Sequence, residues 1–167
     1  MDSQSLFLPA MLLSQQTTAV LHECNDYTSR FCLQLSDQEI QQLVENRKEV
    51  LRSTGRIEFG GGVIQKIVME FADSAYINQQ DYVDILIELQ ECFYYFKTES
   101  TEELTDDELI KIMKLYFEEI CHGDVEFLQT TMLENYCRDI RYGTKEYQYL
   151  NGYEDDYTEF LDWDEME

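Results

Sequence analysis

Residues 79–98 read QQDYVDILIELQECFYYFKT and carry the longest apolar stripe of the chain. The stripe consists of Tyr82, Ile85, Leu86, Leu89, Cys92, Phe93 and Phe96, and Val83, Ile87, Tyr94 and Tyr95 flank it. These positions recur every three or four residues, which is the spacing of a helix face. A helix that is apolar on most of its sides is normally surrounded by other helices. We therefore expect residues 79–98 to form the central helix of a bundle.

Two capping boxes indicate the starts of further helices on either side of this stretch. Ser36 is followed three residues later by Glu39, and Thr105 is followed in the same way by Glu108. In such a box the hydroxyl accepts a hydrogen bond from the backbone three residues on, while the carboxylate accepts one from the capping residue. Each box precedes a run of apolar residues at helical spacing, so each predicts a helix.

Glycines and a capping acid delimit the remaining elements. The two capped helices should end at Gly55 and Gly123, since glycine readily adopts the left-handed conformation that stops a helix. Further helices are expected over residues 124–143, with Asp124 as cap and Gly143 as stop, over 63–71, and near 15–26.

Only residues 30–35 and 56–59 look extended, and both stretches are too short to build a sheet. The expected fold class is therefore all-α. We expect a single compact bundle of about six helices over residues 1–143, followed by an acidic, aromatic C-terminal tail over 144–167 that is disordered or docks as a helix.

The composition indicates a folded, strongly acidic protein. The chain has 167 residues and a formal charge of −23, yet it is 44% hydrophobic and 13% aromatic. Acidic disordered chains lack this apolar content, because they cannot offset the entropy of ordering. Such a charge disfavours direct binding to nucleic acid and to anionic membranes.

The cysteines and the N-terminal stretch bear on the compartment. Five cysteines form an odd set without close pairs, which is typical of reduced thiols. Residues 1–5 lack basic residues, the apolar run 6–13 is interrupted by Pro9, and no run reaches the ~18 apolar residues of a membrane span. We expect a soluble, cytoplasmic protein.

Four stretches carry a resemblance to a known family. They read RIEFGGGVI at 56–64, DSAYI at 73–77, ELQECFYYFK at 88–97 and DDELI at 106–110. Together they resemble an uncharacterised bacterial family, a domain of unknown function, over about residues 12–142. The resemblance implies a single domain but neither an activity nor a functional residue.

A glycine triplet is the strongest indication of a ligand site. Gly60, Gly61 and Gly62 precede an expected helix, whose free amides bind anions, and Arg56 and Lys66 lie nearby. The lysine and hydroxyl residue that complete a P-loop are absent. A tight turn with close helix packing is the simpler interpretation of the triplet.

The chain shows no pattern of a metal, cofactor or catalytic site. His22 and Cys24 are two residues apart, which places them on different faces of a helix. A metal site would require the fold to bring together Cys24, Cys121, His122 and Cys137. Buried core filler explains these cysteines better, and no histidine accompanies a nucleophile motif. We expect no metal, no cofactor and no enzymatic activity.

The tail combines acidic and aromatic residues. Residues 144–167 hold nine acidic residues and one basic residue, a charge of −8, whereas the rest of the chain carries −15. Its candidate partner-binding residues are Tyr153, Tyr157, Phe160, Leu161 and Trp163. Four of them share one helical face, which is suited to a partner's apolar groove with a basic rim or to the chain's own bundle. Both alternatives remain open.

Three hypotheses for function follow. The first is a non-enzymatic acidic module that binds a protein partner with a basic surface. The second is a nucleic-acid mimic that inhibits a DNA- or RNA-binding enzyme, because acidic ridges imitate phosphate charge. The third is a phosphate-ligand-binding protein that uses the turn at residues 60–62.

Overall fold

The computed structural model describes residues 4–100 and 102–142. The helices are α1 (Gln4–Thr28), α2 (Asp37–Thr54), α3 (Gly62–Glu70), α4 (Tyr82–Glu99), α5 (Asp106–Glu119), α6 (Val125–Phe127) and α7 (Leu133–Arg141), with a 3₁₀ turn, η1 (Ser29–Phe31), after α1 and a π-helical turn, η2 (Leu128–Met132), between α6 and α7. No strand occurs in these residues, and the predicted all-α class is confirmed. Helices α6, η2 and α7 are continuous and count as one helical run. The described residues therefore form six helical runs, as expected.

Both capping boxes are present. The Ser36 hydroxyl accepts a hydrogen bond from the Glu39 amide at 3.1 Å, and the Glu39 carboxylate accepts one from the Ser36 amide at 2.9 Å. Thr105 and Glu108 make the same pair of bonds at the start of α5. Gly55 caps the end of α2 with φ of 68°, as the sequence predicts.

Three helix boundaries differ from the predictions. Helix α1 begins at Gln4, well before the expected residue 15, and it packs against α2 and α3. Helix α5 ends at Glu119, short of Gly123, since the backbone already turns left-handed at His122. The stretch expected to be extended at 30–35 begins inside the 3₁₀ turn η1.

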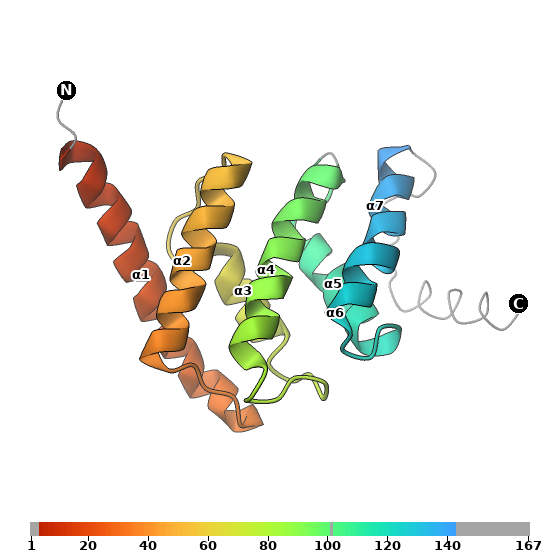
Figure 1. Cartoon of the computed structure of the whole chain (residues 1–167), viewed down its shortest axis with the longest axis horizontal. Helices are drawn as coiled ribbons and strands as arrows, with labels where there is room; N and C mark the ends of the chain where they lie inside the picture. Colours follow the sequence, from red (N-terminus) through yellow and green to blue (C-terminus); the bar gives the residue numbers. More distant parts are fainter. Residues whose placement is uncertain (1–3, 101, 143–167) are drawn as a thin grey trace, which may run out of the picture.

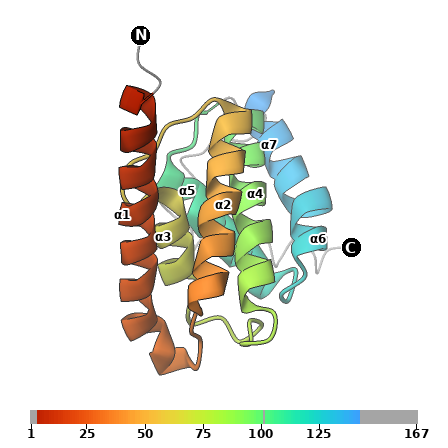
Figure 2. The ribbon, with the colours of Figure 1, turned by 60° about the vertical axis from the view of Figure 1, so that its left-hand side comes forward.

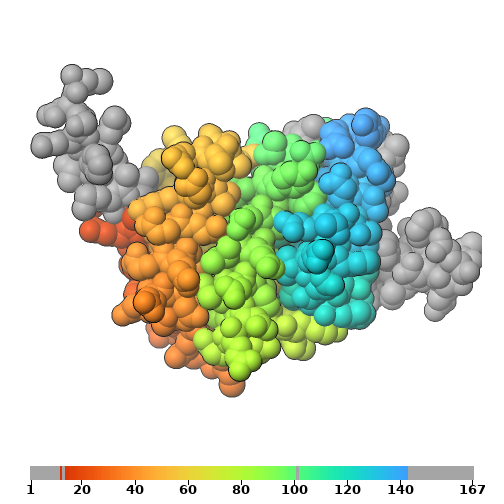
Figure 3. Space-filling view, in the orientation of Figure 1, coloured from red at the N-terminus to blue at the C-terminus, as the bar shows by residue number. Residues whose placement is uncertain are grey.

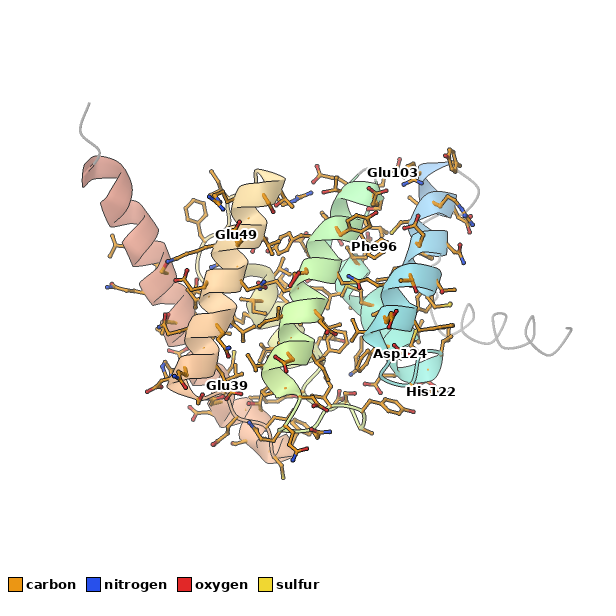
Figure 4. The ribbon with its side chains drawn as sticks, in the orientation of Figure 1. Glu39, Glu49, Phe96, Glu103, His122 and Asp124 are labelled. Atoms are coloured by element: carbon orange, nitrogen blue, oxygen red, sulfur yellow. The ribbon has the colours of Figure 1, made fainter. Side chains whose placement is uncertain are left out.

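Helix α4 occupies the centre of the bundle. Figure 1 shows α2, α4 and α7 side by side, with α3 and α5 behind them, and α4 contacts all four. Its Leu86, Leu89 and Cys92 are fully buried, and Phe96, labelled in Figure 4, is 1% exposed. The expectation of a central helix is therefore confirmed. Figure 2 shows α1 and α2 along one side of this arrangement.

No helix in the described ranges combines the length and the apolar character that crossing a membrane requires. The boundary expected at residues 143 and 144 and the tail at 144–167 lie outside the described residues.

Candidate functional site

The start of α3, where the sequence predicts an anion site, holds a carboxylate of the chain itself. Glu58 Oε1 accepts a hydrogen bond from the Val63 amide at 3.1 Å. Its other oxygen accepts one from the Tyr94 hydroxyl of α4 at 2.5 Å. An external phosphate at this helix end would compete with Glu58 for the same donors.

Arg47 of α2 is the cation beside this carboxylate. Its side chain is buried, and its Nη2 lies 3.6 Å from Glu58 Oε1. Its Nη1 donates to the Gly60 carbonyl at 3.0 Å and to the Thr17 hydroxyl. Thr17 in turn donates to the same Gly60 carbonyl at 2.8 Å. We call Thr17, Arg47, Glu58, Gly60 and Tyr94 the buried turn network, because it fixes the link between α2 and α3.

Burial and the hydrogen bond to Glu58 raise the pKa of Tyr94, so its hydroxyl stays protonated and keeps donating at neutral pH. A carboxylate that is bound by an amide, a hydroxyl and a guanidinium is stable in a partly buried place. The network is therefore a structural element that joins α1, α2, α3 and α4.

The glycine triplet allows close packing at this point. Gly62 has φ of 54°, and a Cβ there would lie 2.8 Å from Arg47 Nη2. A Cβ on Gly61 would lie 2.8 Å from Val20 Cγ1 of α1. These contacts agree with the simpler interpretation of a tight turn between closely packed helices.

The two basic residues of the predicted anion site face other carboxylates. Arg56 donates to Glu102 and, at 3.3 Å, to the Thr98 hydroxyl. Lys66 donates to Asp107 at 2.9 Å, and this hydrogen bond raises the pKa of Lys66. The structure thus brings Gly60, Gly61 and Gly62 together with Arg47 rather than with Arg56 or Lys66, and phosphate binding there stays a prediction.

The sequence contained a signal for Arg47 that we missed. Arg47 follows Ile40, Leu43 and Val44 on the buried stripe of α2. A charged residue on an apolar stripe must find a partner inside the protein. No local pattern indicated that the partner is Glu58, which lies in an irregular link.

The residues considered for a metal site have other surroundings. His122, labelled in Figure 4, lies in the turn before α6. Its ring nitrogen Nδ1 lies 3.0 Å from the Tyr76 hydroxyl. Burial raises the pKa of Cys121 to about 11 and that of Cys137 to about 12, which suits inert thiols. Within residues 4–100 and 102–142, histidines, cysteines and acids form no cluster of three that could hold a metal ion.

A depression of about 440 Å³ lies between the end of α1 and the start of α2. Cys32, the exposed cysteine of the chain, lines it together with Ser36 and Glu39. The last two side chains are committed to the capping box of α2, where Figure 4 labels Glu39. Among the described residues that line the depression there is no histidine, lysine or arginine that would activate the thiol.

The solvent side of α4 has a different character. Asp84, Glu88, Glu91 and Tyr95 are all exposed and follow one another at helical spacings of four, three and four residues. We call Asp84, Glu88 and Glu91 the α4 acidic stripe, with Tyr95 at its end. Figure 3 shows α4 in the middle of a continuous face that α2 and the α6–α7 region complete.

Most basic side chains are already engaged elsewhere. Those within ion-pair distance of a carboxylate are Arg47, Lys48, Arg52, Arg56, Lys66, Lys97, Lys114 and Arg141. Among the described residues, none of them pairs with the α4 acidic stripe, whose Glu91 accepts only a 3.4 Å hydrogen bond from Asn46. Partial desolvation, followed by the charges of Asp84 and Glu91, raises the pKa of Glu88. The stripe is thus a set of carboxylates that repel one another.

A family model matches residues 20–146, which is most of the chain. The chain belongs to DUF6323, a family of unknown function. This membership confirms the resemblance to an uncharacterised family. Neither a curated protein nor a solved structure matches the chain.

The DUF6323 region contains the α4 acidic stripe and, apart from Thr17, the buried turn network. The candidate partner-binding residues of the tail lie beyond this region and outside the described residues. These residues are Tyr153, Tyr157, Phe160, Leu161 and Trp163. The partner-binding role of the tail stays a prediction.

Proposed function

We propose that this DUF6323 chain is a non-enzymatic module that binds a basic surface of a protein partner through the α4 acidic stripe. The observation that carries the proposal is the contrast in pairing. Most cations of the described residues have a carboxylate partner, whereas Asp84, Glu88 and Glu91 have no cation on an open, central face.

The electrostatics of the stripe favour such a partner. Side chains four residues apart on a helix lie about 5–6 Å apart, and like charges at this spacing are destabilising. A lysine or arginine of the partner between two of these carboxylates would relieve the repulsion. Charge of one sign on an open face also increases the rate of encounter with a basic protein.

Tyr95 adds an anchor at the end of the stripe. Tyr95 is 52% exposed, and the charge of Glu99 raises the pKa of its hydroxyl. Exposed tyrosines are frequent contributors to binding energy, because a rigid aromatic ring buries much area. The tail would add further acidic and aromatic residues to such an interaction. The five free cysteines fit a cytoplasmic, reducing setting.

The test is affinity capture from native cells with two charge-matched variants of the full chain. Asp84→Asn/Glu88→Gln/Glu91→Gln removes three charges from the stripe. Glu45→Gln/Glu49→Gln/Asp107→Asn removes three charges that pair with Lys48, Arg52 and Lys66. Circular dichroism should show that both variants remain folded.

We expect the wild type and the control variant to retain the same basic protein, and the stripe variant to bind it about 10-fold more weakly, as several exposed charge pairs together allow. Binding should weaken as salt rises. Equal retention by the two variants would contradict the proposal. Displacement of the partner by duplex DNA would instead favour the mimicry hypothesis, since DNA and the stripe would then share one binding surface.

A further inference from the structure

The link between α2 and α3 exposes two large apolar side chains. Ile57 is 78% exposed and Phe59 is 73% exposed. Exposure alternates along the link, because Arg56 and Glu58 are bound to residues of the bundle. Such alternation places Ile57 and Phe59 together on the outer side of the link. We call these two residues the link apolar pair, and the buried turn network holds Glu58 between them in place.

The last described residue lies at the same end of the bundle as this pair. Arg56 donates a hydrogen bond to the Thr98 hydroxyl at 3.3 Å, and Arg141 donates one to the Glu99 carboxylate at 2.7 Å. The link and the end of α7 therefore both contact the end of α4. Figure 1 shows the ends of α2, α4 and α7 together at one end of the bundle. Tyr142, the last described residue, is itself 71% exposed.

We propose that in the free protein the C-terminal tail of the same chain docks on the link apolar pair. The candidate binding residues of the tail are large and apolar, and a helix would place four of them on one face. They are Tyr153, Tyr157, Phe160 and Leu161, and Trp163 follows them. Aromatic side chains are stabilised by packing against apolar groups, and exposed apolar residues commonly mark the surface that receives them. Asp155, Glu159 and Asp162 would lie on the opposite side of the same helix, where water and a basic partner can reach them.

The length of the tail permits this contact. Neighbouring helices pack about 8–10 Å apart, so α2 lies about 20 Å from α7, with α4 between them. Residues 143–153 span up to about 36 Å when extended, so the apolar face of the tail can reach the link. A segment tethered at this distance acts at an effective concentration on the order of 1 mM. The tether therefore favours the tail over a second copy or a free partner as the occupant.

Charge favours the link over the exposed face of α4 as the place where the tail docks. Arg52 and Arg56 border the link, and each lies within ion-pair distance of one glutamate, so acidic and basic groups balance there. The α4 acidic stripe pairs with no cation among the described residues. The stripe would therefore repel the tail, whose charge is −8, more strongly than the surroundings of the link do.

The fluorescence of Trp163, the single tryptophan of the chain, tests the proposal. Emission and acrylamide quenching are measured on the full chain, with the urea-unfolded chain as the reference for an exposed indole. We expect blue-shifted emission and weaker quenching in the wild type, because docking covers the indole. Phe59→Glu should lower the docking constant at least about 10-fold, since a carboxylate would be desolvated in the contact. Phe59→Ser removes the ring without adding a charge and should change the quenching in the same direction.

Phe127→Glu is the matched control. Phe127 is 40% exposed, and Figure 4 labels Asp124, close to it in the sequence, at the end of the bundle opposite Glu103. The variant adds the same charge far from the link and should leave Trp163 protected. Circular dichroism should show that all variants remain folded.

Two results would overturn the proposal directly. One is a wild-type indole that is quenched as strongly as in the unfolded chain, and the other is protection that both Phe59 variants leave unchanged. Protection that appears only at high protein concentration would show that the tail docks on a second copy, and protection that requires an added basic partner would assign the tail to that partner. Both would contradict docking on the same chain. None of these results affects the α4 acidic stripe, which the affinity capture tests separately.

Discussion

Carboxylates on the two sides of α4 differ in whether they have partners within the protein. On the buried side, Glu58 is bound by the Val63 amide, by Tyr94 and by Arg47. On the solvent side, Asp84 and Glu88 have no hydrogen-bond or ion-pair partner among the described residues. Water can stabilise an exposed carboxylate, whereas a buried one requires protein donors. The inward-facing carboxylate thus has protein donors, whereas Asp84 and Glu88 rely on water and are available to another protein.

The largest loss in the free energy of unfolding should come from removing Arg47, the cation of the buried turn network. Arg47→Met leaves Glu58 and the Gly60 carbonyl without a guanidinium, and breaking a buried ion pair from one side costs about 3–5 kcal/mol. Urea unfolding monitored by circular dichroism measures this loss.

Arg52→Met is the control for this experiment. Arg52 lies on the same helix, its side chain is 76% exposed, and it pairs with Glu49. Its removal should change the free energy of unfolding by no more than about 1 kcal/mol. Equal losses for the two variants would show that burial does not decide the value of these pairs.

An intermediate loss in the free energy of unfolding is expected for Tyr94→Phe but not for the adjacent Tyr95→Phe. Tyr94→Phe removes the hydroxyl that donates to Glu58, and a hydrogen bond to a charged group contributes about 1.5–3 kcal/mol. Tyr95→Phe removes an exposed hydroxyl, so the free energy of unfolding should change by about 0.5 kcal/mol or less. The same urea titration compares them, and a larger loss for Tyr95→Phe would contradict the assignment of the two sides.

The smallest effect should be a gain in stability when one charge of the α4 acidic stripe is removed. Partial desolvation and the charges of Asp84 and Glu91 raise the pKa of Glu88, so the folded state disfavours its ionised form. This cost is absent below the unfolded pKa of about 4.3 and develops as pH rises through the raised folded value. Glu88→Gln should therefore stabilise the fold at pH 7 by about 0.5 kcal/mol or less, and not at pH 3.

The matched control is Glu45→Gln, which removes a carboxylate paired with Lys48 and should not stabilise the fold at pH 7. Unfolding at both pH values measures the two variants. If Glu88→Gln were less stable than the wild type at pH 7, the stripe would hold a favourable interaction that compensates its charge.

Local sequence patterns predicted which segments are helical more accurately than where each helix begins and ends. The capping boxes at Ser36 and Thr105 were confirmed because their hydrogen bonds join residues only three positions apart. The N-terminal limit of α1 was not predicted, since the expected helix began near residue 15 and α1 begins at Gln4. Thr17 is buried against the link at Gly60, which is a contact between residues 43 positions apart.

The candidate sites were predictable to different degrees. The exposed spacing of Asp84, Glu88 and Glu91 is visible in the central stretch, but whether a basic residue of another helix pairs with them depends on the packing. Ile57 and Phe59 flank Glu58 in the sequence without any sign of which of the three faces inward. The structure turns Glu58 toward Arg47 and leaves the two apolar neighbours exposed.

The sequence by itself determined the all-α class, the central position of α4 and the capped starts of α2 and α5, because periodicity and capping act over one or two helical turns. Only the tertiary structure decided which charges are neutralised. Arg47 meets Glu58, Arg56 meets Glu102 and Lys66 meets Asp107 across gaps in the chain that no local rule spans. Electrostatic partners depend on distance in space, so the acidic surface left for function is a product of the packing.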